Sequence, residues 1–122
     1  MDKAQTIHNF WSSFGLKAYD ETIVPDEAVM PYITYSVRTD SLESMLTLNA
    51  SVWYKGTSWE QVSKKVEEIA EAIDTMYPPA IKTDTGRLYL TRGVPYAQRV
   101  ADEDKMVRRI YLILNAEFLT DH

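Results

Sequence analysis

The chain has 122 residues, of which 45% are hydrophobic and 25% are charged, and its formal net charge is −5. A chain of this length buries roughly 65% of its unfolded surface, which is enough for one core, and its composition is that of a globular protein. The acidic balance disfavours a protein that binds nucleic acid by neutralising phosphates. Because the sequence contains no cysteine, disulfides, thiolate zinc sites and a cysteine nucleophile are excluded.

The N-terminal segment lacks the charged and then apolar pattern of a secretion signal. No apolar run approaches the roughly 20 residues that a helix needs to cross a bilayer. We therefore expect a soluble intracellular protein that has no contact with a membrane.

Two segments have the periodicity of amphipathic helices. Residues 3–14 repeat apolar side chains at spacings of three and four, which predicts a short helix. Its apolar stripe consists of Ile7, Phe10, Trp11 and Phe14. Residues 59–76 predict a longer helix in the same way, and Pro78 and Pro79 follow it. The stripe of this second helix consists of Trp59, Val62, Val66, Ile69 and Ile73.

Most of the remaining chain alternates apolar and polar residues as β-strands do. The main predicted strands are 32–39, 45–55, 80–83, 87–91 and 106–119, with shorter extended pieces at 17–19 and 96–100. Short links join the first two main strands and the next two, which predicts two antiparallel hairpins. The fold class predicted for residues 1–122 is a single α+β domain, in which two amphipathic helices pack on one face of an antiparallel β-sheet.

The last predicted strand is apolar on both of its faces. One face carries Ile110, Leu112 and Leu114 and belongs to the core, whereas the other carries amphipathic and apolar groups. A sheet face that meets water is usually polar, so we expect a neighbouring subunit to cover this second face. The predicted subunit interface consists of Trp53, Tyr89, Arg109, Tyr111 and Ile113.

Catalytic patterns are missing from the sequence. The two histidines are His8, beside the stripe of the first helix, and His122, and neither has a nucleophile turn near it in the sequence. The isolated glycines do not form a phosphate-binding loop, and the acidic segment 20–27 lacks the spacing of a calcium loop. We expect no catalytic residues, no metal site and no bound cofactor, and hence no enzyme.

Arginines are concentrated in the second half of the chain. They are Arg87, Arg92, Arg99, Arg108 and Arg109. Guanidinium groups pair well with carboxylates, so these arginines are candidates for contacts with an acidic patch of a neighbouring subunit, such as residues 20–27 or 102–104. A nucleic-acid patch and ordinary solvated arginines are the other two interpretations.

The layout of the chain resembles a family of bacteriophage proteins. The resemblance lies in Phe10-Trp-Ser-Ser-Phe-Gly15, Val29-Met-Pro-Tyr-Ile-Thr-Tyr35, Val52-Trp-Tyr54 and the helix that follows Ser58. These segments resemble the tail terminator or tail-completion proteins of tailed bacteriophages. Minor capsid and head–tail joining proteins are similar in the same way. The likeness covers most of the chain and includes no catalytic motif, so no functional residue is transferred by it.

The resemblance implies a virion structural protein. In that family a small α+β subunit forms a ring, commonly of six, which caps the finished tail tube and docks to the head connector. It implies a homo-oligomer at the tail–head junction, assembled in the host cytoplasm, with the tail tube protein and the head connector protein as partners. DNA would pass through the ring without specific binding, which the acidic net charge suits.

Two other functions remain open at this point. One is a dimeric small-molecule-binding or regulatory α+β domain, with the sheet aromatics lining a pocket. The other is a small enzyme that uses carboxylates for acid–base chemistry.

Overall fold

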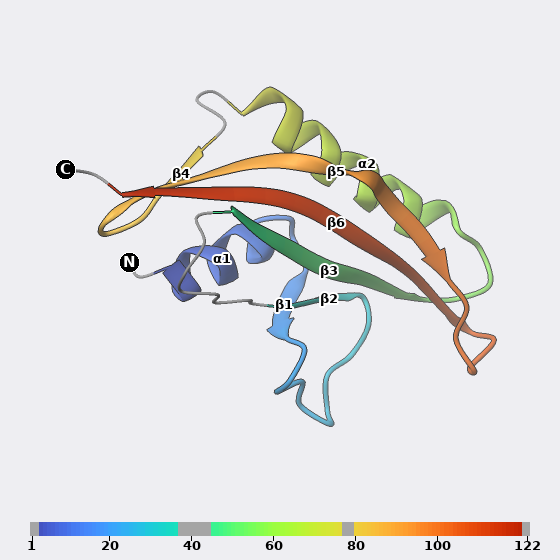
Figure 1. The fold of residues 1–122 in the computed structure, drawn as a ribbon. Coiled ribbons are helices and arrows are strands. Elements are labelled where there is room, and N and C mark those ends of the chain that lie inside the picture. Colours follow the sequence, from blue (N-terminus) through green and yellow to red (C-terminus); the bar gives the residue numbers. More distant parts are fainter. Residues whose placement is uncertain (1–2, 37–44, 77–79, 121–122) are drawn as a thin grey trace.

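The computed structural model describes residues 3–36, 45–76 and 80–120. Figure 1 shows helices packed beside a sheet of long, curved strands. The helices are α1 (Lys3–Ser12) and α2 (Glu60–Thr75). The strands are β1 (Lys17–Asp20), β2 (Tyr32–Tyr35), β3 (Met45–Lys55), β4 (Ala80–Lys82), β5 (Gly86–Val100) and β6 (Val107–Thr120). Neither helix in the described ranges is long and apolar enough to cross a membrane.

The strands form one six-stranded sheet in the order β1-β2-β3-β6-β5-β4. Four of the five pairings are antiparallel, but β1 runs parallel to β2. The prediction of a purely antiparallel sheet was therefore wrong, and the sheet is mixed. The reason lies in residues 21–31, which carry the chain from the end of β1 back to the level where β1 began. A parallel pair requires such a crossover.

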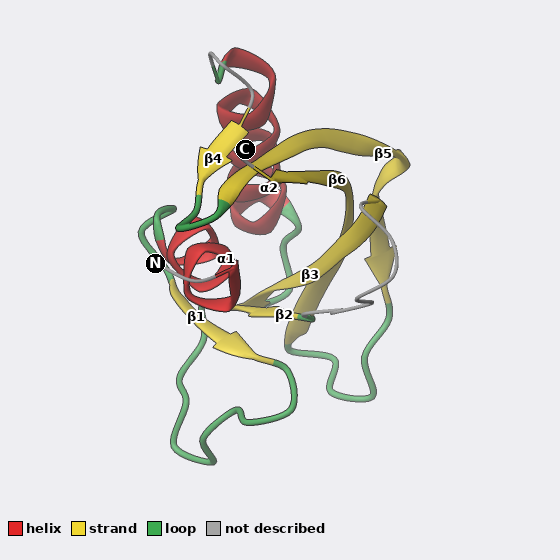
Figure 2. Cartoon of the chain, turned by 60° about the vertical axis from the view of Figure 1, so that its left-hand side comes forward, coloured by secondary structure: helices red, strands yellow, loops and turns green. Residues whose placement is uncertain are grey.

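Both helices pack into a single core on one side of the sheet, as the sequence predicts. The buried side chains of α1 and α2 belong to the same hydrophobic cluster as Leu48, Leu112 and Leu114 of the central strands. Figure 2 shows that the long strands bow and that both helices lie on the inner side of the curve. We call the opposite side of the sheet the outer face.

The strand boundaries follow the prediction with two qualifications. The predicted strand 32–39 is confirmed as β2 over Tyr32–Tyr35, and residues 37–39 lie outside the described ranges. The predicted break at Gly93 and Pro95 is a bulge within a single strand, β5, because the register with β6 shifts between Arg92 and Ala97. A bulge allows a strand to bend without leaving its sheet.

Gly86 begins β5 at a point where the backbone of β6 leaves no room for a side chain. A Cβ atom at this position would meet the carbonyl oxygen of Leu119, which cannot move without breaking the pairing of β5 with β6. We expect Gly86→Ala to lower the free energy of unfolding by about 1–3 kcal/mol, as overpacking does. Urea denaturation will measure this loss. Thr85→Ala, in the exposed turn before Gly86, is the control and is expected to change stability little.

Tyr96 links the bulge of β5 to α2 by a hydrogen bond. Its hydroxyl donates a hydrogen bond to the carbonyl oxygen of Val66, with 2.9 Å between the oxygens. Burial raises the pKa of the Tyr96 phenol well above its usual value, and the nearby Arg92 opposes this shift only in part. The folded protein therefore holds this proton more tightly than the unfolded chain does.

This raised pKa makes stability depend on pH in the alkaline range. The contribution of Tyr96 is fully present below the unfolded pKa of about 10 and is lost as the pH rises from there toward the folded pKa. We expect Tyr96→Phe to flatten the decline of the melting temperature between about pH 9 and pH 11. Parallel thermal melts of the two proteins test this, and equal slopes would contradict it.

Candidate subunit interface

The strand register arranges the outer face in rows that run across the sheet. One row joins Lys17 to Tyr32, Tyr32 to Trp53, and Trp53 to Arg109. The next row along the strands contains Tyr19, Thr34, Ser51, Tyr111 and Gln98. Since side chains alternate along each strand, all of these residues point away from the core side. The two rows place the largest amphipathic side chains of the sheet beside one another.

Aromatic and cationic groups in these rows contact each other across four strands. The ring centroids of Tyr19 and Tyr32 are 5.7 Å apart, and those of Tyr32 and Trp53 are 6.2 Å apart. The guanidinium carbon of Arg109 lies 4.6 Å from the centroid of the Trp53 ring, a cation–π contact. The sequence of contacts Tyr19–Tyr32–Trp53–Arg109 therefore forms one continuous ladder, which we call the aromatic ladder.

Hydrogen bonds to small buried side chains fix the orientation of the ladder. The indole Nε1 of Trp53 donates to the Thr34 hydroxyl at 2.8 Å. The Nε of Arg109 donates to the Ser51 hydroxyl at 2.9 Å. Thr34 and Ser51 are themselves buried, at 8% and 3% exposure. Because these large side chains are already ordered, little rotamer freedom would be lost when another surface binds to them.

The structure brings together four of the five predicted interface residues. Trp53 and Arg109 share one row, Tyr111 lies in the next, and Ile113 lies in the one after it. Tyr89 is separated from them, because it pairs with Glu117 near the other end of β6. All five are only partly buried within the single chain. Their role as an interface stays a prediction.

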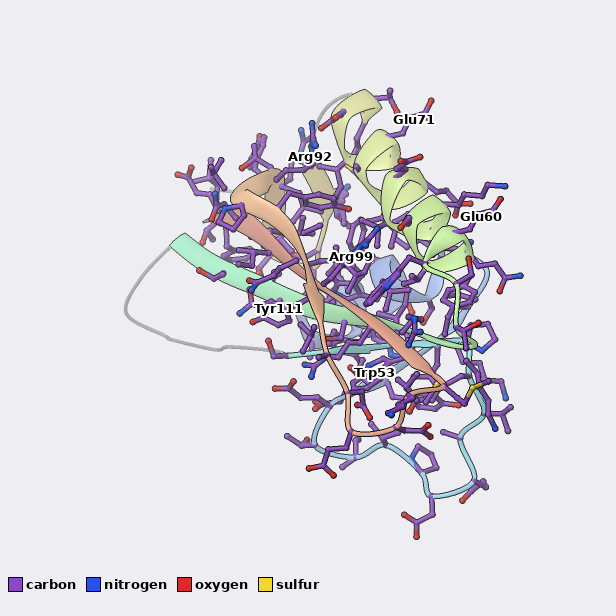
Figure 3. All side chains as sticks on the ribbon, turned by 90° about the vertical axis from the view of Figure 1, so that its right-hand side faces the viewer. Trp53, Glu60, Glu71, Arg92, Arg99 and Tyr111 are labelled. Atoms are coloured by element: carbon purple, nitrogen blue, oxygen red, sulfur yellow. The ribbon has the colours of Figure 1, made fainter. Side chains whose placement is uncertain are left out.

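Neither helix covers this group of residues. The apolar stripes of α1 and α2 pack into the core, which lies on the other side of the sheet. In Figure 3 Arg92 and Arg99 lie on the α2 side of the strands, whereas Trp53 and Tyr111 lie away from that helix. Within the described residues, the partial burial of Trp53 comes from its neighbours on the outer face.

The five late arginines do not form one patch. Arg92 pairs with Asp74 of α2 at 2.8 Å, on the helix side of the sheet. Arg99 and Arg108 also lie there, with their guanidinium carbons 4.7 and 5.3 Å from the centroid of the Trp59 ring. Only Arg87 and Arg109 belong to the outer face, since their neighbours in the register are Leu119 and Trp53. The five arginines therefore do not share one surface, although Arg99 and Arg108 lie together beside Trp59.

Shallow pockets open at several places on the described part of the chain. One of about 400 Å³ is lined by residues of α1 and β1, including His8 and Ser12. The Nδ1 of His8 lies 2.8 Å from the Tyr35 hydroxyl, and its Nε2 lies 3.3 Å from the Ser12 hydroxyl. Ser12 is exposed on the helix surface, so this contact lacks a strained nucleophile turn. Among the described residues, no group of histidine or acidic side chains is arranged to hold a metal ion.

The sequence pattern did not predict that Lys17, Tyr19 and Tyr32 belong to the candidate interface. The alternation in residues 32–39 assigns Tyr32 to the face away from Ile33, which was a usable signal. The positions of Lys17 and Tyr19 depend on the parallel pairing of β1 with β2, and no local pattern predicts that pairing.

The fold defines an α+β protein with a curled, mixed sheet and two helices on one face. Comparison with solved structures shows that this fold is similar to a chain from the virion of a native gene transfer agent particle. The TM-score is 0.56, the sequence identity is 16%, and the match covers 89% of this chain and 83% of the other. No protein-family model matches the sequence, and no curated protein matches it.

Proposed function

We propose that this chain is a structural protein of a phage-like virion, which assembles into a ring that caps the tail tube and joins it to the head connector. The observation that carries the proposal is the aromatic ladder around Trp53, which is ordered, partly exposed and uncovered by the helices. Tyrosine, tryptophan and arginine are the residues most enriched at protein interfaces. An identical copy is the partner we assign to this face.

The structural neighbour supports the virion part of the proposal. It comes from the virion of a native gene transfer agent particle, and its fold matches 89% of this chain. The sequence segments that resemble tail-terminator proteins support the more specific role in capping and joining. Under this role the partners are further copies of the chain, the tail tube protein and the connector protein, and the location is the tail–head junction of the virion.

A ring is the assembly that a head-to-tail contact through the outer face would build. If the outer face binds a different part of the next copy, each contact is head-to-tail, and such contacts close into a ring when the rotation permits. The net charge of −5 suits a channel that repels the DNA backbone and lets it pass. The proposed role is mechanical and requires neither catalysis nor a cofactor.

Negative-stain electron microscopy of the purified chain tests the proposal. At micromolar concentration we expect annular particles of uniform diameter, each of which contains about six subunits. A field without annular particles across a range of concentration and salt would contradict the proposal. The alternative of a small-molecule-binding dimer predicts something else, namely a rise in melting temperature with one compound of a metabolite set, and no rings.

A further inference from the structure

The outward side of α2 carries an excess of negative charge. Its acidic residues are Glu60, Glu67, Glu68, Glu71 and Asp74, and its basic residues are Lys64 and Lys65. Both lysines already pair within the helix, with Glu60 at 3.4 Å and with Glu68 at 3.0 Å. Asp74 pairs with Arg92 of β5. Among the described residues, the carboxylates of Glu67 and Glu71 have no ion-pair partner.

Glu67 and Glu71 form an exposed pair of like charges. They lie four residues apart on α2, so their carboxylates project from the same side of the helix, and neither has an ion-pair partner among the described residues. Two glutamates at this spacing repel each other and disfavour the helix that contains them. A cationic surface placed against α2 would remove this repulsion.

The outer face of the sheet has the opposite charge. The register places basic side chains at both of its ends, and Glu117 is the only acidic residue among the outward positions of the described strands. The basic residues are Lys17, Lys55, Lys82, Arg87 and Arg109. Lys17 and Lys55 flank the aromatic ladder, are exposed, and make no ion pair within the described chain.

These two surfaces lie on opposite sides of the subunit. The buried side of α2 contacts the inner face of the sheet, so most of its charged side points away from the sheet. Two residues at the margin of that side border β5, where Asp74 pairs with Arg92 and Glu67 lines a shallow pocket with Arg99. We infer that the acidic side of α2 in one copy docks on the outer face of the next copy, with Glu67 and Glu71 opposite its basic side chains. This inference rests on the proposed ring and names the two surfaces that form it.

The chemistry of the two surfaces fits such a contact. Tyrosine hydroxyls on the outer face donate hydrogen bonds to carboxylates, and lysine and arginine pair with them directly. The aromatic rings also cover the aliphatic stems of the lysine and glutamate side chains on α2. Because the two surfaces differ, the contact is heterologous, as ring closure requires.

Charge reversal on each surface tests the inference. One variant, Glu67→Lys with Glu71→Lys, reverses the helix surface, and the other, Lys17→Glu with Lys55→Glu, reverses the sheet surface. Each alone sets like charges against each other, so we expect the concentration at half-assembly to rise about tenfold or more, as measured by sedimentation velocity. Circular dichroism checks that each variant remains folded.

Mixing the two variants supplies the decisive comparison. In the mixture, the lysine-bearing helix of one variant meets the glutamate-bearing sheet of the other, and the two remaining surfaces are also complementary. We expect the mixture, and a chain that carries all four substitutions, to assemble again at nearly the original concentration. If both variants fail to assemble and neither combination restores assembly, the two surfaces do not face each other, and the inference is overturned.

A matched control separates this contact from a general effect of charge. Glu103→Lys reverses a charge at an exposed position outside both surfaces, and it is expected to assemble normally. If both reversed variants also assemble normally, the inference fails while the proposed ring stands. If the unaltered chain forms no oligomer at any concentration, the proposed function fails and the inference fails with it.

Discussion

Replacing Tyr111 with aspartate is expected to weaken oligomer formation strongly while leaving the single subunit folded. Tyr111 lies in the row next to Trp53 and Arg109, near the middle of the outer face, and it is partly exposed in the single chain. Because the Tyr111 side chain points away from the core, the substitution leaves the core packing unchanged, and we expect the monomer to remain folded. In a subunit contact, however, the new carboxylate would be buried at the centre of the interface.

The expected effect is large because central interface residues carry much of the binding energy. Loss of a central tyrosine costs about 2 kcal/mol or more, and burial of an unpaired charge adds to it. We therefore expect the concentration at half-assembly to rise about a hundredfold. Sedimentation velocity measures this shift, with Thr85→Asp in the exposed β4–β5 turn as the control. Normal assembly of Tyr111→Asp would exclude the outer face as the contact.

Trp11→Ala is expected to produce the largest loss of stability. Trp11 is 0% exposed, and it packs edge-on against Phe10, with 4.9 Å between ring centroids. It holds α1 in the same core as the inner face of the sheet. Removal of a buried tryptophan side chain costs about 3–5 kcal/mol, a large part of the 5–15 kcal/mol that stabilises a typical domain.

Urea denaturation measures this loss most cleanly in a monomer. Performing it in the Tyr111→Asp background removes the coupling between unfolding and subunit dissociation. Leu119→Ala is the control, because Leu119 is 47% exposed on the outer face and its truncation leaves the core intact. A change below about 1 kcal/mol for Trp11→Ala would contradict the packing of α1 described above.

Local periodicity predicted most of the fold. The alternation in the last strand assigns Ile110, Leu112 and Leu114 to one face, and all three are buried. The stripe of α2 was predicted in the same way, and Val62 and Ile69 are 0% exposed. Such patterns depend only on neighbours along the chain, so one sequence is enough to reveal them.

The parallel strand β1 is the part of the fold that periodicity did not predict. Its four residues are too few to reveal a sheet partner, and its pairing with β2 depends on the path of residues 21–31. The same limit applies to the candidate interface. Trp53 and Tyr111 were assigned to the outer face from alternation, whereas the contact of Tyr19 with Tyr32 arises from tertiary pairing.

The arginines show why residue type alone is a poor guide to a shared surface. Arg108 and Arg109 are adjacent in the sequence, yet they lie on opposite faces of β6. One flanks Trp59 on the helix side and the other flanks Trp53 on the outer face. In a strand, neighbouring side chains point in opposite directions, so a run of like charges is divided between two surfaces.

Native mass spectrometry at micromolar concentration is the most direct measurement of whether identical copies cover the outer face. We expect one discrete closed oligomer, with a mass that is a whole multiple, about six, of the 14.1 kDa subunit. A stable 14.1 kDa monomer throughout this concentration range would contradict it.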